Sequence, residues 1–92
     1  FNCYNYPNPF ETTTQFSFEI TQKSDINLKI FSLAGRKVKS FYFYNIKAGF
    51  HIIDWDGRNE IGGKISRGVY IYKIDAINDN SKSSYIGKCA KY

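Results

Sequence analysis

Seven short runs in which apolar residues alternate with polar ones, separated by turn sequences about every ten residues, predict an all-β fold. The class that fits this pattern is an immunoglobulin-like antiparallel β-sandwich of about seven strands. The chain has 92 residues, which is enough for one domain spanning residues 1–92. Hydrophobic residues make up 42% of it and aromatic residues 18%, so it is too apolar for a disordered tail. No segment shows helical periodicity, and no apolar run approaches the roughly 18 residues that a membrane span needs.

The first three runs span residues 2–6, 15–20 and 26–30. In the second run, Phe16, Phe18 and Ile20 alternate with polar residues, as in a strand with one buried face. In the third run, Ile26, Leu28 and Ile30 alternate with polar residues in the same way. The runs 15–20 and 26–30 are therefore expected to be half-buried strands, and a short strand is expected at 2–6.

The fourth run, residues 37–44, is reached through a tight turn at Ser32-Leu33-Ala34-Gly35. Serine at the first position and glycine at the last suit a turn that joins two strands into a hairpin. The alternation in this run is blurred by Tyr42 and Tyr44. The blur predicts either a β-bulge near Ser40 or aromatic side chains on both faces of the strand.

The last three runs span residues 48–55, 68–76 and 82–90. Within 68–76, the side that carries Tyr70, Tyr72, Ile74 and Ala76 is uncharged, so it is expected to point inward. Asp56-Gly57 and Gly62-Gly63 bracket a polar loop before this run, and Asn78-Asp79-Asn80-Ser81 predicts the final hairpin turn.

The net charge is +5, and most of the excess lies late in the chain. Six basic and two acidic residues fall within 61–92. Such a basic end indicates either an anionic partner or a solvated face that keeps edge strands apart. No cluster is denser than Arg36-Lys37-x-Lys39, so we expect no nucleic acid partner.

Two cysteines lie near opposite ends of the chain, Cys3 and Cys89. They are either a possible disulfide, if the first and last strands are neighbours, or two buried free thiols. In the chain-entropy model, a disulfide that closes a loop of this length stabilises the folded domain by about 4–5 kcal/mol. A disulfide would place the protein in an oxidising compartment. There is no CxxC pair for redox catalysis, and too few ligands for a zinc site.

No motif for catalysis, a cofactor or a metal emerges. The single histidine, His51, has no nucleophile near it in sequence, and Trp55 is expected in the core. The loop from Asp54 to Glu60 begins like a calcium loop, but Gly57 falls at the wrong position and the final glutamate is absent. We therefore expect a polar turn, no catalytic residues, no metal and no cofactor.

Exposed tyrosines leave one further class of function open. Tyr4, Tyr42, Tyr44 and Tyr92 would suit a carbohydrate-binding module if several of them share one exposed sheet face.

Five motifs, in order, cover nearly the whole chain. They are Tyr6-Pro7-Asn8-Pro9-Phe10, Lys29-Ile30-Phe31-Ser32-Leu33-Ala34-Gly35-Arg36-Lys37-Val38, Ala48-Gly49-Phe50-His51, Trp55-Asp56-Gly57-Arg58 and Gly68-Val69-Tyr70-Ile71-Tyr72. Together they resemble the C-terminal sorting domains of the type IX secretion system, and equally the related immunoglobulin-like domain named for the flagellar hook-capping protein (FlgD-like).

The resemblance implies a non-catalytic domain at the C-terminal end of a larger secreted or cell-surface protein that travels through the periplasm and outer membrane. Its partners would be the secretion machinery at the outer membrane and upstream domains of the same chain; the absence of an initiator methionine at Phe1 suits such a piece. The residues that the resemblance assigns to recognition and sorting are Tyr6, Pro7, Asn8, Pro9, Lys29, Gly35, Lys37, Gly68, Tyr70 and Lys88. The alternatives are a structural spacer or assembly domain, and a carbohydrate-binding accessory module.

Overall fold

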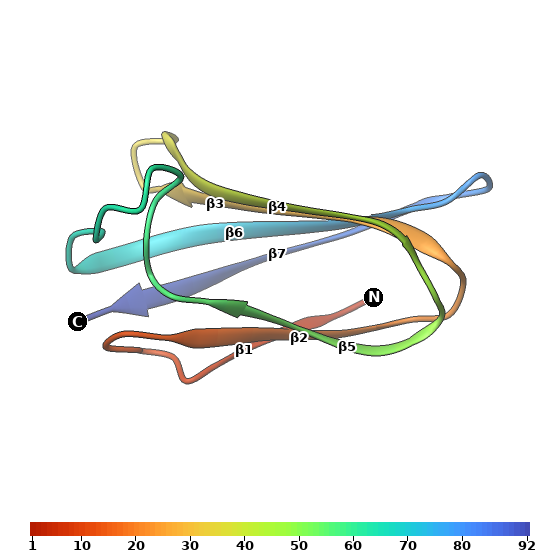
Figure 1. The fold of residues 1–92 in the computed structure, drawn as a ribbon, viewed down its shortest axis with the longest axis horizontal. Helices are drawn as coiled ribbons and strands as arrows, with labels where there is room; N and C mark the ends of the chain where they lie inside the picture. Colours follow the sequence, from red (N-terminus) through yellow and green to blue (C-terminus); the bar gives the residue numbers. More distant parts are fainter.

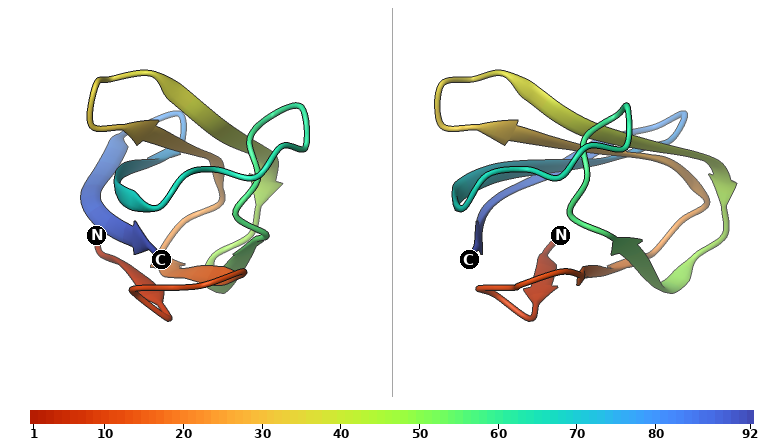
Figure 2. Two further views of the ribbon diagram at one scale, coloured as in Figure 1. Left: turned by 90° about the vertical axis from the view of Figure 1, so that its left-hand side faces the viewer. Right: turned by 60° about the vertical axis from the view of Figure 1, so that its left-hand side comes forward.

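The computed structural model describes all residues 1–92, and they form two antiparallel sheets packed face to face (Figures 1 and 2). The strands, in chain order, are β1 (Cys3–Tyr6), β2 (Thr14–Ile20), β3 (Ser24–Ser32), β4 (Lys37–Ile46), β5 (Gly49–Trp55), β6 (Gly68–Ile77) and β7 (Lys82–Lys91). One sheet has the order β1-β2-β5 and the other β4-β3-β6-β7. The predicted seven-stranded immunoglobulin-like sandwich is confirmed.

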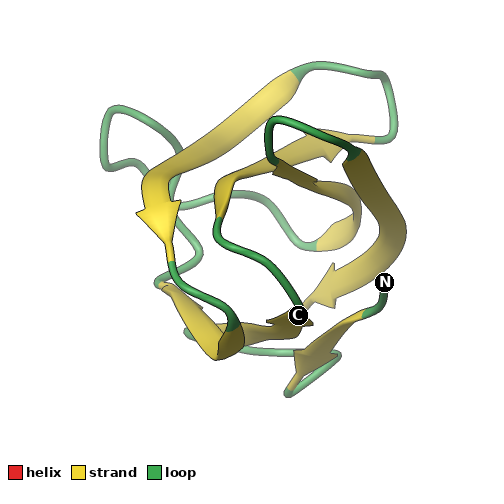
Figure 3. Ribbon diagram, turned by 90° about the vertical axis from the view of Figure 1, so that its right-hand side faces the viewer, coloured by secondary structure: helices red, strands yellow, loops and turns green.

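The structure contains no helix (Figure 3), and hence none long and apolar enough to cross a membrane.

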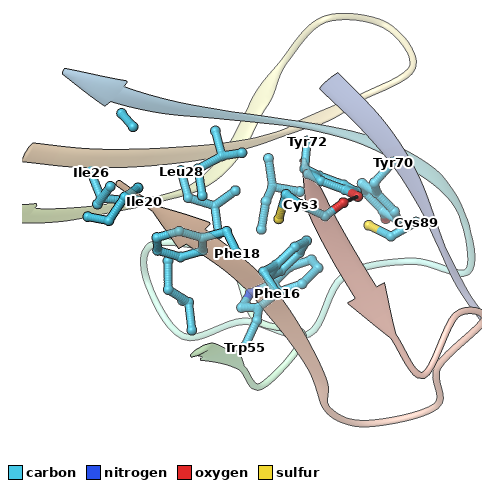
Figure 4. Close-up of a cluster of buried hydrophobic side chains, with 14 of the residues drawn as sticks. Cys3, Phe16, Phe18, Ile20, Ile26, Leu28, Trp55, Tyr70, Tyr72 and Cys89 are labelled. Atoms are coloured by element: carbon cyan, nitrogen blue, oxygen red, sulfur yellow. Dashed lines mark hydrogen bonds between the residues drawn. The ribbon is translucent and has the colours of Figure 1, made fainter. Parts of the chain in front are cut away.

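The core lies between the sheets and is built from the alternating positions that the sequence predicts. Phe16, Phe18 and Ile20 point into it from β2, and Tyr70 and Tyr72 point into it from β6 (Figure 4). Trp55 is 1% exposed, which confirms its expected place. Its indole N–H donates to the carbonyl of Arg58 at 3.0 Å, so the buried polar atom of the ring is satisfied.

The fourth strand contains two irregularities of register. Ile30 lies opposite Lys39 whereas Phe31 lies opposite Lys37, so Val38 is an extra residue in β4. A second shift occurs where Asn45 takes a positive φ of 55°. The bulge expected near Ser40 thus lies at Val38, and the aromatic residues of β4 also occupy both faces.

Local hydrogen bonds fix the two predicted hairpin turns. The N–H of Gly35, whose φ is +86°, donates to the carbonyl of Ser32 at 2.9 Å. At the other end of the sandwich, the side-chain oxygen of Asn78 accepts from the backbone N–H groups of Asn80 and Ser81. Both turns are confirmed.

The first and last strands are neighbours, but they belong to different sheets. β1 is an edge strand of the three-stranded sheet and β7 an edge strand of the four-stranded sheet, and the two come into contact. Cys3 and Cys89 are both free, and each is 1% exposed. The structure thus has the second of the two arrangements expected for them.

Candidate recognition site

The Tyr6-Pro7-Asn8-Pro9 segment binds the free edge of the last strand. The side chain of Asn8 donates from Nδ2 to the carbonyl of Lys88 at 2.9 Å and accepts at Oδ1 from the N–H of Ala90 at 3.0 Å. The hydroxyl of Thr14, which is 1% exposed, holds the segment from the other side by donating to the carbonyl of Pro7 at 2.7 Å. Both proline peptide bonds are cis. One short loop therefore joins the two sheets.

Phe10 completes this contact and anchors it in the core. Its N–H donates to the carbonyl of Ala90, and its carbonyl accepts from the N–H of Tyr92 at 3.0 Å. The ring is 1% exposed and lies 5.5 Å from the ring of Trp55, between centroids. Gly57 passes so close that a Cβ there would meet a Phe10 ring carbon at 3.2 Å. We call residues 6–10 the edge clamp, because they satisfy backbone groups that an edge strand leaves open.

Three of the predicted recognition residues have structural roles at the same end of the sandwich. Tyr70 is 7% exposed, and its hydroxyl donates to the carbonyl of Ser66 at 2.6 Å, which is the tyrosine corner of immunoglobulin-like domains. Gly68 begins β6, and Gly35 closes the β3–β4 turn. In Figure 1 the β3–β4 turn and the start of β6 lie at the left end, together with the loop between β1 and β2.

Lysines gather on the outer face of the four-stranded sheet. Lys29 lies directly opposite Lys73 on the neighbouring strand. In the adjacent row, Lys37 lies opposite Phe31, Phe31 opposite Ile71, and Ile71 opposite Lys88. Since directly opposed residues share a face, all four lysines project from one side of the sheet. We call Lys29, Lys37, Lys73 and Lys88 the lysine face.

The structure thus brings most of the sequence-predicted set together. Asn8 touches the backbone of Lys88, and Lys29, Lys37 and Lys88 share one face. Tyr70 does not join them, because its side chain is in the core. Lys73 was not predicted: the period of two placed it outward, but only the strand order places it beside Lys29.

The Val38 bulge explains how Lys37 reaches this face. Without the extra residue, position 38 would lie opposite Phe31, and Lys37 would point the other way. The loop before β6 fixes the bulge: the N–H of Glu60 donates to the carbonyl of Val38 at 3.2 Å, and the N–H of Ser40 donates to Oε1 of Glu60 at 2.5 Å. Two hydrogen bonds from Ser40 lower the pKa of Glu60; the bond from the backbone N–H has the larger effect and the bond from the hydroxyl the smaller one.

The polar residues of the 54–60 loop are engaged within the protein. Asp54 accepts from the side chain of Gln15, Asp56 accepts from the N–H of Arg58, and Asn59 accepts from the N–H groups of Ile61 and Gly63. Their bonds are those of a polar turn.

His51 is an ordinary residue of an edge strand. Its Nε2 lies 2.7 Å from the carbonyl of Lys47, and its ring packs near Phe18 with 5.8 Å between centroids.

The thiols of Cys3 and Cys89 are unreactive near neutral pH. Burial raises the pKa of Cys3 to about 12 and that of Cys89 to about 11, so hardly any thiolate forms near neutral pH. The Tyr72 hydroxyl lies between the sheets beside them and donates to the carbonyl of Cys3 at 3.4 Å. Neither cysteine is placed as a nucleophile.

The exposed tyrosines are divided between the two sheets. Tyr4, 66% exposed, projects from β1, whereas Tyr42 and Tyr44 stack on each other along β4 with 5.2 Å between ring centroids. Tyr42 and Tyr44 thus lie together on the four-stranded sheet, whereas Tyr4 lies on the other sheet.

Fold and exposed features together define an immunoglobulin-like β-sandwich that offers a clamped edge strand and a charged sheet face. The family model of the FlgD Ig-like domain matches residues 5–80. The chain belongs to that family. The basal-body rod modification protein FlgD of Salmonella typhimurium (strain LT2) is 31% identical over 72 residues, which cover 77% of this chain and 31% of the relative. The FlgD of Salmonella typhi matches equally. The chain therefore spans about a third of the curated relatives it matches.

Solved structures of low sequence identity share the fold. Dimeric latent PorU from Porphyromonas gingivalis matches with a TM-score of 0.77 and 22% identity, covering 97% of this chain and 9% of PorU. FlgD from Xanthomonas campestris matches with a TM-score of 0.71 and 18% identity, covering 94% of this chain and 62% of that FlgD. PorZ from Porphyromonas gingivalis matches with a TM-score of 0.65 and 20% identity, covering 98% of this chain and 11% of PorZ. It is described as an essential surface component of the type IX secretion system.

Proposed function

We propose that this domain is a non-catalytic sorting and anchoring module, which directs a larger protein through the type IX secretion system to the cell surface. The observation that carries the proposal is the convergence of motif residues from distant parts of the chain. Asn8, Lys37 and Lys88 come from three distant segments of the chain. Asn8 bonds to the backbone of Lys88, and Lys37 and Lys88 project from the same face of the sheet. A folded surface of this kind can be recognised without any chemistry of its own.

The fold relatives support this role and a second one. PorU and PorZ share the sandwich, and PorZ belongs to the type IX system by its description. FlgD of Salmonella typhimurium, by contrast, is 31% identical, and the description of the Xanthomonas FlgD calls hook capping essential for flagellar assembly. The second candidate is therefore a structural assembly domain that joins neighbouring subunits or domains.

The test is a fusion of residues 1–92 to the C-terminus of a secreted reporter, in a host that has the type IX system. We expect the reporter on the cell surface or in the medium. A reporter that stays in the periplasm while the domain is folded would contradict sorting and favour the assembly role.

Variants for this test must change the proposed recognition surface without unfolding the domain. Deleting residues 82–92 would remove all of β7, including Cys89 of the core, and would unfold the sandwich. The double substitution Lys37→Gln and Lys88→Gln removes only exposed charge, so the domain should stay folded while export falls. Lys23→Gln with Lys47→Gln is the matched control, because both lysines are exposed and lie at the opposite end.

A further inference from the structure

The lysine face carries more positive charge than the fold requires. Edge strands are often protected from pairing with other chains by lysines, and Lys37 on β4 and Lys88 on β7 suit that role. Lys29 and Lys73, however, lie on the two central strands, where no edge needs protection. They oppose each other directly, which is a destabilising arrangement for like charges.

Little on the face compensates this charge. Lys73 forms the protein's one ion pair, at 4.0 Å with Asp75, and its side chain remains 40% exposed. Asp75 is also engaged by the hydroxyl of Ser84 at 2.5 Å. Lys29, Lys37 and Lys88 have no acidic partner within ion-pair distance. The outer face of the other sheet has the opposite character, since its charged residues are Glu19 and Asp54.

Apolar side chains separate the lysines. Phe31 and Ile71 are half-buried between Lys37 and Lys88, and Ile86, opposite Lys73, is 64% exposed. With strands about 4.8 Å apart, the apolar centre is about 14 Å wide between the outer lysines. An apolar centre with a charged rim is the anatomy of a protein–protein interface. A polysaccharide or a nucleic acid would leave the isoleucines unmatched.

We propose that the lysine face is a docking surface for a protein partner that presents carboxylates around an apolar centre. Charge complementarity selects the partner and accelerates encounter, and the isoleucines and Phe31 supply apolar contact. The inference rests on the proposed recognition role, for which it names the face and the chemistry of the partner.

The first experiment maps binding on the ¹⁵N-labelled domain by NMR. The probe is a synthetic peptide in which Glu and Leu alternate, at low ionic strength. We expect amide shifts confined to Lys29, Phe31, Ile71 and Lys88, which disappear when Gln replaces Glu and weaken above 0.1 M salt, where the screening length is about 10 Å. Shifts elsewhere, or none, would overturn the inference. So would binding of heparin or anionic lipid vesicles at this face with no response to the peptide.

The second experiment compares two triple variants of equal charge change. The combination Lys29→Gln, Lys37→Gln and Lys88→Gln, which leaves the Lys73–Asp75 ion pair intact, should weaken peptide binding about tenfold, since exposed charge pairs contribute modestly and additively. Its melting temperature should stay the same or rise, because a like-charge contact is removed. The control combination, Lys23→Gln, Lys47→Gln and Lys64→Gln, should leave binding at the wild-type level. Equal loss in both would show non-specific attraction and overturn the proposal.

Reporter export separates this inference from the proposed function. If the face variant loses peptide binding but the reporter still reaches the surface, the lysine face is not the sorting contact and the inference fails, while sorting stands. If the wild-type fusion itself is not exported, sorting fails, whereas peptide binding still tests the face.

Discussion

The edge clamp predicts a stability cost for one exposed side chain. Asn8→Ala removes two hydrogen bonds to the backbone of β7, at 2.9 and 3.0 Å. Each such bond contributes about 0.5–1.5 kcal/mol net, and solvent near Asn8 reduces the sum, so we expect a loss of about 1–2 kcal/mol. In a domain of this size each kcal/mol corresponds to about 4–8 °C in melting temperature. This is far more than the roughly 0.5 kcal/mol typical of an exposed position.

Urea denaturation followed by tryptophan fluorescence measures this cost, because Trp55 is the single tryptophan and lies next to Phe10. Hydrogen exchange gives a local readout, since the N–H of Ala90 should lose protection in the variant. Asn80→Ala is the control, because Asn80 is equally exposed at a turn but its side chain makes no hydrogen bond. If Asn8→Ala is as stable as the control and Ala90 stays protected, the clamp contributes no stability and our reasoning is wrong.

Three further predictions concern the core. First, burial raises the pKa of both Cys3 and Cys89, so above their ordinary pKa of about 9 the unfolded chain releases protons that the native chain keeps. The free energy of unfolding should therefore fall from about pH 9 upward in thermal melts, and a double Cys→Ala variant should fall less steeply; an identical slope would contradict the assignment. Second, a methyl group on Gly87 would collide with the hydroxyl and ring of Tyr72, so Gly87→Ala should cost about 1–3 kcal/mol in urea denaturation. A neutral result would mean that the ring moves freely. Third, Tyr70→Phe should lower the free energy of unfolding by about 1–2 kcal/mol, because it removes the hydrogen bond to the carbonyl of Ser66. Export should stay unchanged, since this is the only hydrogen bond of the hydroxyl. An export defect in a stable variant would show that Tyr70 takes part in recognition.

The elements of the fold could be predicted because their signal is local. The alternation at Phe16 and Phe18 gave the inward face of β2, and the uncharged side of 68–76 gave that of β6. Turn chemistry at Gly35 and Asn78 marked the hairpins. The break in alternation around Tyr42 also indicated a bulge, although its position depends on a contact with Glu60 that is remote in sequence.

The candidate site could not be assembled in the same way, because it depends on strand order. Lys29 and Lys73 are 44 positions apart in the sequence, and only the pairing of β3 with β6 makes them neighbours. Likewise, the proline-containing motif identified Asn8 as important, but its bonds join residues about 80 positions apart. Such contacts follow from topology, for which the sequence alone carries no local signal.

The edge clamp ties the beginning of the domain to its final strand, and this has a consequence for quality control. A nascent or truncated chain that ends before Lys88 has no partner for Asn8, and a chain that ends before Ala90 has none for the backbone of Phe10. Its sandwich stays open, with aromatic core residues accessible to proteases. Closure of the domain therefore requires that synthesis has reached at least Ala90. Under the sorting role proposed above, a receptor that binds only the closed form would reject a protein whose last domain is incomplete, without contacting the rest of that protein.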